Sequence, residues 1–119
     1  MTPLGARLRS MREERGITLK QMAKALDVSS AYLSALEHGR RGKPTWYLLQ
    51  RIIAFFNVIW DEAEELQRLA ELSDPKISID TGGLTPEATE FANRLARDIG
   101  RLAPDDLTFL TTELQRRVK

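Results

Sequence analysis

The sequence predicts an all-helical protein: five helices, then a short strand and a C-terminal helical hairpin. Three observations support this prediction. Apolar residues recur at helical spacing along nearly the whole chain of 119 residues. Gly, Pro, Asn and Asp interrupt the periodic stretches at intervals. Small hydroxyl residues stand before several of these stretches, where their oxygens can accept hydrogen bonds from the free N–H groups of a new helix.

The first two helices are marked by one apolar stripe each. The first helix has Pro3 in its first turn, ends at Gly16 and places on one face Leu4, Leu8 and Met11. Thr18 then caps a second helix of about two turns. Its inward residues are Leu19, Met22, Ala23 and Leu26.

Three further helices follow in the first part of the chain. Ser29 caps a third helix that Gly39 ends. A basic loop, RRGKP, leads to a fourth helix that Thr45 caps and Asn57 ends; its expected apolar face is Trp46, Leu49, Ile52, Ile53 and Phe56. An acidic first turn at Asp61 opens the fifth helix. We expect both Trp46 and Trp60 to anchor the core, since aromatics at helical spacing usually fill volume.

The last third of the chain has a different organisation. Residues 76–80, KISID, alternate apolar and polar side chains, which predicts a short strand that needs a partner strand. Thr85 and Pro86 open one helix, and a break at Ala103-Pro104 leads into another. The predicted organisation is therefore a domain over 1–72, a linker with the short strand over 73–84, and a helical hairpin over 85–119.

Composition limits the possible functions. With 42% hydrophobic and 29% charged residues the chain is typical of a soluble globular protein. No apolar run could span a bilayer and the amino terminus lacks a signal-peptide core, so we expect a cytoplasmic protein without membrane contact. The absence of cysteine and the single histidine, His38, argue against a zinc site. We expect no metal, no cofactor and no enzymatic activity.

The near-neutral net charge conceals an asymmetry. Residues 1–58 hold ten Lys or Arg against four acids, while residues 59–119 hold eight against thirteen. A basic segment of this size suits a polyanion, although it is equally compatible with a solvated face.

Two short helices joined by a tight turn, with a basic loop after the second, are the pattern of a DNA-binding helix-turn-helix. Ala23 lies where the two helices must cross closely, and Leu33 and Leu36 point inward. The opposite side of the third helix then carries the small residues Ser30, Ala31, Ser34 and Ala35.

These residues resemble the phage repressor and Cro-like helix-turn-helix family, also called the XRE family, over roughly residues 4–72. The resemblance includes the LExG ending of the third helix and the Pro after the basic loop, and it implies the five-helix lambda-repressor-like DNA-binding domain. It further implies that Arg12 pairs with Glu37. It assigns base contacts to Ser29, Ser30, Ala31, Tyr32 and Ser34. The sequence departs from the family at Asp27, where Gly is usual; Asp tolerates the left-handed conformation, so we expect an intact turn.

Phosphate contacts are expected from side chains that flank the recognition helix. These residues are Thr18, Lys20, Gln21, Arg40, Arg41 and Lys43. Arg7 and Arg9 either contact phosphate or line a solvated first helix. Tyr32 either reaches DNA or packs on the domain.

The favoured hypothesis is a sequence-specific DNA-binding transcriptional regulator, a repressor that binds a palindromic operator as a homodimer. Dimerisation is assigned to Ile77, Ile79, Phe91, Leu95, Ile99, Leu107, Leu110 and Leu114. Alternatively, the hairpin folds onto the first domain of the same chain. The competing function is an antitoxin or coactivator-type protein-interaction module, with a protein partner bound through the acidic C-terminal part.

Overall fold

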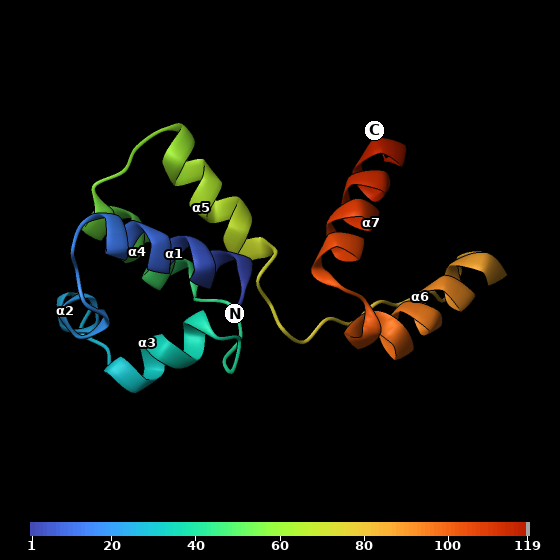
Figure 1. The fold of residues 1–119 in the computed structure, drawn as a ribbon, viewed down its shortest axis with the longest axis horizontal. Coiled ribbons are helices and arrows are strands. Elements are labelled where there is room, and N and C mark those ends of the chain that lie inside the picture. Colours follow the sequence, from blue (N-terminus) through green and yellow to red (C-terminus); the bar gives the residue numbers. More distant parts are fainter. Residues whose placement is uncertain (119) are drawn as a thin grey trace. The chain divides into compact units, whose positions relative to one another are not determined.

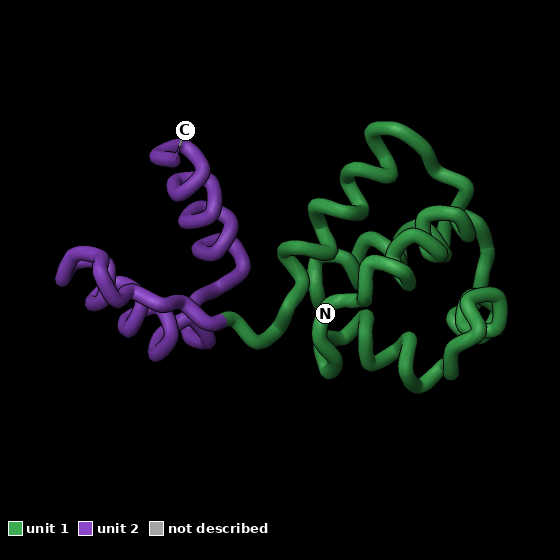
Figure 2. Tube along the Cα trace, turned by 180° about the vertical axis from the view of Figure 1, so that it is seen from behind, with its two compact units in different colours: residues 1–77 green, residues 78–119 purple. Residues whose placement is uncertain are grey.

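The computed structural model describes residues 1–118 as an all-helical chain (Figure 1). The prediction of an all-helical protein is confirmed. The helices fall into two compact units, Met1–Ile77 and the described residues from Ser78 onward (Figure 2). Lys119, the last residue of the predicted hairpin, lies outside the described residues.

Unit 1 contains five helices, and each begins close to its expected residue. They are α1 (Pro3–Glu14), α2 (Leu19–Ala25), α3 (Ser30–Glu37), α4 (Trp46–Phe56) and α5 (Asp61–Glu71). Side-chain hydroxyls cap the first four: Thr2, Thr18, Ser29 and Thr45 each accept a hydrogen bond from a backbone N–H in the first turn. Helix α5 has no such cap and instead carries acids in its first turn, near the positive end of its dipole.

The core of unit 1 is built from the apolar stripes of all five helices. Its most deeply buried side chains include Leu4, Leu8, Met22, Leu26, Leu33, Ile52 and Leu66. Helix α3 packs against both α1 and α2, and α5 packs against α1 and α4. The recognition helix of the predicted motif is therefore held from two sides.

The expectation that both tryptophans anchor this core is wrong. Trp46 is 73% exposed and Trp60 is 79% exposed. Trp46 is the first residue of α4 and lies at the edge of the core. The buried side chains in the first turn of this helix are instead Leu48 and Leu49. Trp60 precedes α5 with φ 55° and ψ −122°, a backbone conformation that large side chains rarely adopt.

Left-handed residues end the helices where the sequence predicts ends. Asp27 has φ 58° and Asn57 has φ 53°. Beyond α2, Val28 N donates to Ala23 O at 3.0 Å, which closes the end of the helix. The substitution of Asp for the usual Gly thus leaves the turn between α2 and α3 intact.

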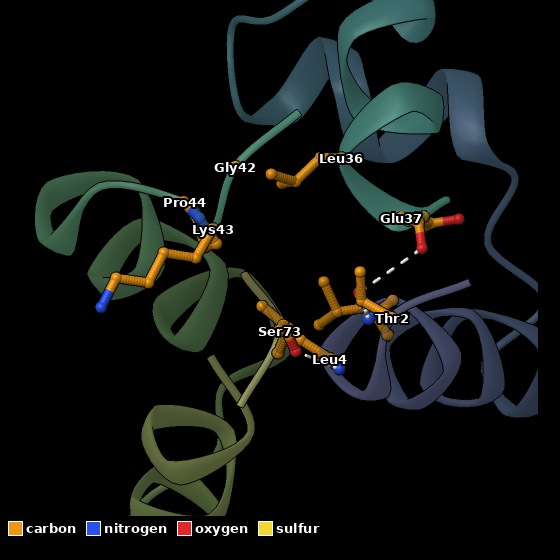
Figure 3. A pocket seen from close by; sticks show the side chains of 10 residues that line it. Thr2, Leu4, Leu36, Glu37, Gly42, Lys43, Pro44 and Ser73 are labelled. Atoms are coloured by element: carbon orange, nitrogen blue, oxygen red, sulfur yellow. Dashed lines mark hydrogen bonds between the residues drawn. The ribbon is translucent and has the colours of Figure 1, made fainter. Parts of the chain in front are cut away.

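The amino terminus of α1 is fastened to the end of α3. Thr2 N donates to the Glu37 carbonyl oxygen at 3.0 Å (Figure 3). Gly5 packs directly on the same carbonyl, where a side chain would collide with it. The buried Ser73 hydroxyl accepts from Leu4 N at 2.9 Å and donates to Leu69 O at 2.5 Å. The pocket between these residues leaves no room for a bound molecule, and the compact unit extends past residue 72 to Ile77.

Unit 2 contains α6 (Pro86–Asp98), a 3₁₀ turn (Ile99–Arg101) and α7 (Pro104–Arg117). Thr85 caps α6 by accepting from Ala88 N. Hydrogen bonds from Arg116 and then from Arg117 to the Glu113 carboxylate lower the pKa of Glu113 below its ordinary value.

Two expectations about the C-terminal part are not met. The described residues contain no strand, and residues 76–80 run as irregular chain, because no second strand is present there to complete a ladder. The two helices also fail to close their apolar stripes on each other: they separate from the corner at 99–103 (Figure 1), and neither contains a buried residue. Among the described residues, no helix is both long and apolar enough to cross a membrane.

Candidate nucleic-acid interface

The turn between α2 and α3 fixes the orientation of the candidate recognition helix. Ala23 and Met22 of α2 and Leu33 of α3 are fully or almost fully buried. The small side chain of Ala23 allows the two helices to approach closely. The buried face of α3 thereby leaves its other face toward solvent.

The exposed face of α3 begins with small side chains. Ser29, Ser30 and Ala31 are exposed, while Ser34 is half-buried. The Ser29 hydroxyl accepts from Tyr32 N at 3.0 Å, so this oxygen is already engaged as the helix cap. Ser30 and Ala31 are therefore the residues of this face whose side chains are both exposed and uncommitted within the described chain.

Tyr32 connects the recognition helix to the basic loop. Its ring is half-buried against the core, and the Arg41 guanidinium carbon lies 5.4 Å from the ring centre. The ring thus packs on the domain, and a DNA contact by its exposed part stays a prediction. The contact also holds Arg41 beside α3, and the sequence pattern gave no sign of it.

Cations flank the exposed face on two sides. Arg40, Arg41 and Lys43 are exposed in the loop after α3, and Lys20 is exposed in the first turn of α2. None of these four side chains forms an ion pair within the described residues. Their full charge is therefore available to a polyanion.

The other predicted phosphate ligands are committed locally. Thr18 and Gln21 form a reciprocal capping box: Gln21 N donates to the Thr18 hydroxyl at 3.1 Å, and Thr18 N donates to Gln21 Oε1 at 2.9 Å. Of the two uncertain arginines, Arg9 donates to Glu13 at 3.1 Å, whereas Arg7 is exposed. The side-chain amide nitrogen of Gln21 takes no part in this capping box, so its N–H groups can still donate to a phosphate.

Arg12 and Glu37 join α1 to the end of α3. Arg12 Nη2 lies 3.1 Å from Glu37 Oε1, and Glu37 is only 2% exposed. Arg12 Nε and Glu37 Oε2 are buried without a hydrogen-bond partner in the described chain. The pair thus connects the two helices through one charged hydrogen bond and leaves one buried polar atom on each side chain unpaired.

The predicted dimerisation residues are not buried within their own units. All of them except the half-buried Leu95 are exposed: Ile77, Ile79, Phe91, Ile99, Leu107, Leu110 and Leu114. The sequence reasoning also missed Gly5 and Ser73. Gly5 lies on the same helical face as Leu8 and Arg12, and a glycine within a buried stripe is a sign of close backbone approach.

A short helix, a left-handed turn and a second helix with a small polar face between cations define a helix-turn-helix protein. The chain matches the family described as "Helix-turn-helix domain" over residues 3–69. The chain belongs to this family, and its resemblance to XRE-like helix-turn-helix regulators is confirmed.

Three similar proteins carry regulator names. The HTH-type transcriptional regulator PrpR of Mycobacterium tuberculosis is 38% identical over 72 residues, which cover 59% of this chain and 15% of PrpR. The HTH-type transcriptional regulator RghRB of Bacillus subtilis is 34% identical over 61 residues, 51% of this chain and 44% of RghRB. The HTH-type transcriptional repressor RghR of Bacillus subtilis is 46% identical over 44 residues, 37% of this chain and 33% of RghR. The matches thus span less than half the length of each relative. No solved structure is a significant match.

Proposed function

We propose that the protein is a sequence-specific DNA-binding transcriptional regulator that represses by occupying a palindromic operator as a homodimer. The observation that carries the proposal is the free face of α3, where Ser30 and Ala31 lie exposed between unpaired cations. A helix of this kind fits the major groove of B-DNA, where base edges differ in their donors and acceptors.

The chemistry divides between orientation and readout. Lys20, Arg40, Arg41 and Lys43 neutralise phosphates and fix the helix in the groove. The Ser30 hydroxyl can bond to several bases, and Ala31 can contact a thymine methyl group. Because Ser30 and Ala31 distinguish few bases directly, much of the discrimination between DNA sequences arises from the shape and deformability of the DNA.

Dimerisation compensates for the small contact area of one module. Two modules related by a two-fold axis read two half-sites about 34 Å apart, and their linkage adds affinity. The exposed apolar residues of unit 2 supply the surface for this association. The repressor assignment follows the name of the relative RghR and the steric effect of an occupied operator.

The test is a selection of genomic fragments by the purified chain. An enriched motif with two-fold symmetry supports the proposal. The matched variant Ser30→Leu, with the cations intact, should retain salt-sensitive binding and lose the enrichment. If this variant recovered the same motif, α3 would not be the helix that reads the bases.

The alternative is an antitoxin or coactivator-type interaction module on the same scaffold. The thirteen acids of residues 59–119 favour it, because they suit a basic protein partner. Under this alternative the selection returns no motif, and binding to random duplex DNA shows little dependence on salt.

A further inference from the structure

Helix α7 carries an apolar face that nothing else in the described part of unit 2 covers. Leu107, Leu110 and Leu114 recur at intervals of three and four residues and therefore lie on one side of the helix. They are 37%, 46% and 60% exposed. An isolated helix of 14 residues is marginal in water, so its stability depends on covering this face.

The charges at the two ends of α7 have opposite signs. Asp105 and Asp106 lie in the first turn, and Arg116 and Arg117 lie in the last turn. Within the described residues, the two aspartates form no ion pair, and both arginines share the single carboxylate Glu113. Asp106 accepts a hydrogen bond from Ala103 N at 3.1 Å, but no cation neutralises the acidic end within the described residues. The basic end has more positive than negative charge.

We propose that the α7 helix of a second copy of this chain covers the face, running antiparallel, with the two-fold axis passing beside Leu110. This inference rests on the homodimer of the proposed function and specifies its geometry. In this register Leu107 lies opposite the partner subunit's Leu114, and Leu110 lies beside the partner subunit's Leu110.

The same register places opposite charges together. Asp106 and Arg117 are about three helical turns apart and flank the apolar face on the same edge. The antiparallel pairing therefore places Asp106 near the partner subunit's Arg117. A parallel pair would bring the two acidic ends together, and the two basic ends would repel each other as well. The apolar and charged patterns thus favour the same antiparallel pairing, which is self-complementary as a two-fold interface requires.

The chain contains no cysteine, so cross-linking can report the register directly. Leu107→Cys and Leu114→Cys are prepared separately in the full chain and mixed in equal amounts under mild oxidation without DNA. A disulfide requires Cα atoms within about 7 Å. We expect a covalent dimer from the mixture and little from Leu107→Cys alone. The matched control mixes Leu107→Cys with Thr112→Cys, which lies on the opposite side of α7, and should not cross-link.

Two results would overturn the inference. Efficient cross-linking of Leu107→Cys alone means a parallel pair. No cross-link in the mixture, with DNA binding intact in a salt titration, means that another surface joins the subunits while the proposed function stands. Conversely, if the mixture forms a covalent dimer but the chain selects no DNA sequence, the proposed function is rejected and the α7 interface is supported.

A second measurement avoids changes to the apolar face. Asp105→Arg with Asp106→Arg should raise the dimer dissociation constant in sedimentation at least tenfold, because both ends become basic. Adding Arg116→Asp and Arg117→Asp exchanges the ends and should recover most of the affinity. Failure of this recovery, with helicity retained in circular dichroism, would contradict the antiparallel pairing.

Discussion

Gly5 and the carbonyl of Glu37 are in contact so close that no other residue fits at position 5. A Cβ atom on Gly5 would lie 2.1 Å from the Glu37 carbonyl oxygen and 2.7 Å from its carbonyl carbon. These are backbone atoms at the end of the recognition helix, so they cannot swing aside as a flexible side chain would.

Gly5→Ala should therefore destabilise unit 1 by about 3 kcal/mol, the upper part of the usual range for overpacking. Urea denaturation measures the free energy of unfolding. The control is Gly42→Ala, since nothing lies within 4 Å of a Cβ placed there. Equal stability of the two variants would show that α1 can move away from α3 at little cost.

Glu37→Ala should cost on the order of 3 kcal/mol, because it leaves Arg12 charged and buried without a partner. Glu13→Ala removes the exposed partner of Arg9 and should change stability by less than about 0.5 kcal/mol. The double variant Arg12→Met, Glu37→Leu should recover much of the loss, since apolar residues of similar volume often replace a buried pair. Thermal unfolding of Glu37→Ala that matches the parent would refute the importance of the pair.

DNA affinity should fall steeply with salt concentration. Four neutralised phosphates per subunit give a log–log slope of about −3.6 for each half-site. Replacing Arg40 and Arg41 by Ala should make the slope less negative by about 1.8 per half-site and weaken all sequences alike. The control Arg68→Ala removes a cation that is paired with Glu65 on α5 and should leave the slope unchanged. A parent slope near zero would reject DNA binding.

Residues 1–77 alone should fold, remain monomeric and lose most operator affinity, because a single half-site lacks the avidity of linkage. Ending the fragment at residue 72 would remove the Ser73 hydroxyl that binds Leu4 N, so this shorter fragment should be less stable. Sedimentation and DNA titration test both statements. Full affinity in the 1–77 fragment would show that unit 2 is not the dimerisation element.

Trp60→Gly should raise the free energy of unfolding by about 1 kcal/mol, because it relieves a strained backbone at the cost of an exposed ring. Trp60→Ala removes the same ring and keeps a Cβ, so it should bring no such gain. Urea midpoints of the two variants separate strain from ring contacts. Equal midpoints would mean that the backbone at Trp60 is relaxed.

Local signals in the sequence predict most of unit 1, because caps and left-handed turns depend on a few adjacent residues. Ser29, Thr45 and Asn57 act where the pattern places them. Periodicity shows that a stripe is apolar, but it does not show what covers the stripe. Trp46 belongs to the apolar stripe of α4 but is not covered by the core, and Phe91 belongs to a stripe that the described part of unit 2 leaves exposed.

The candidate interface also has a part that the sequence predicts and a part that it does not. The exposed face of α3 and the basic loop are predictable from residue types and spacing. The contact between Tyr32 and Arg41 and the committed hydroxyl of Ser29 depend on three-dimensional placement, so spacing alone does not predict them.

The outward tryptophans make the chain its own optical reporter. Trp46 begins α4 directly after the basic loop, and Trp60 follows the opposite end of the same helix. The fluorescence of an indole in water has its maximum at a longer wavelength than that of a buried indole. Both exposed rings should therefore emit at long wavelength in the free protein. In a Trp60→Phe background, the emission wavelength and the quenching of Trp46 report binding beside the basic loop. With Trp46→Phe, the signal comes from the distant end, and the difference between the two spectra locates a bound molecule without any label.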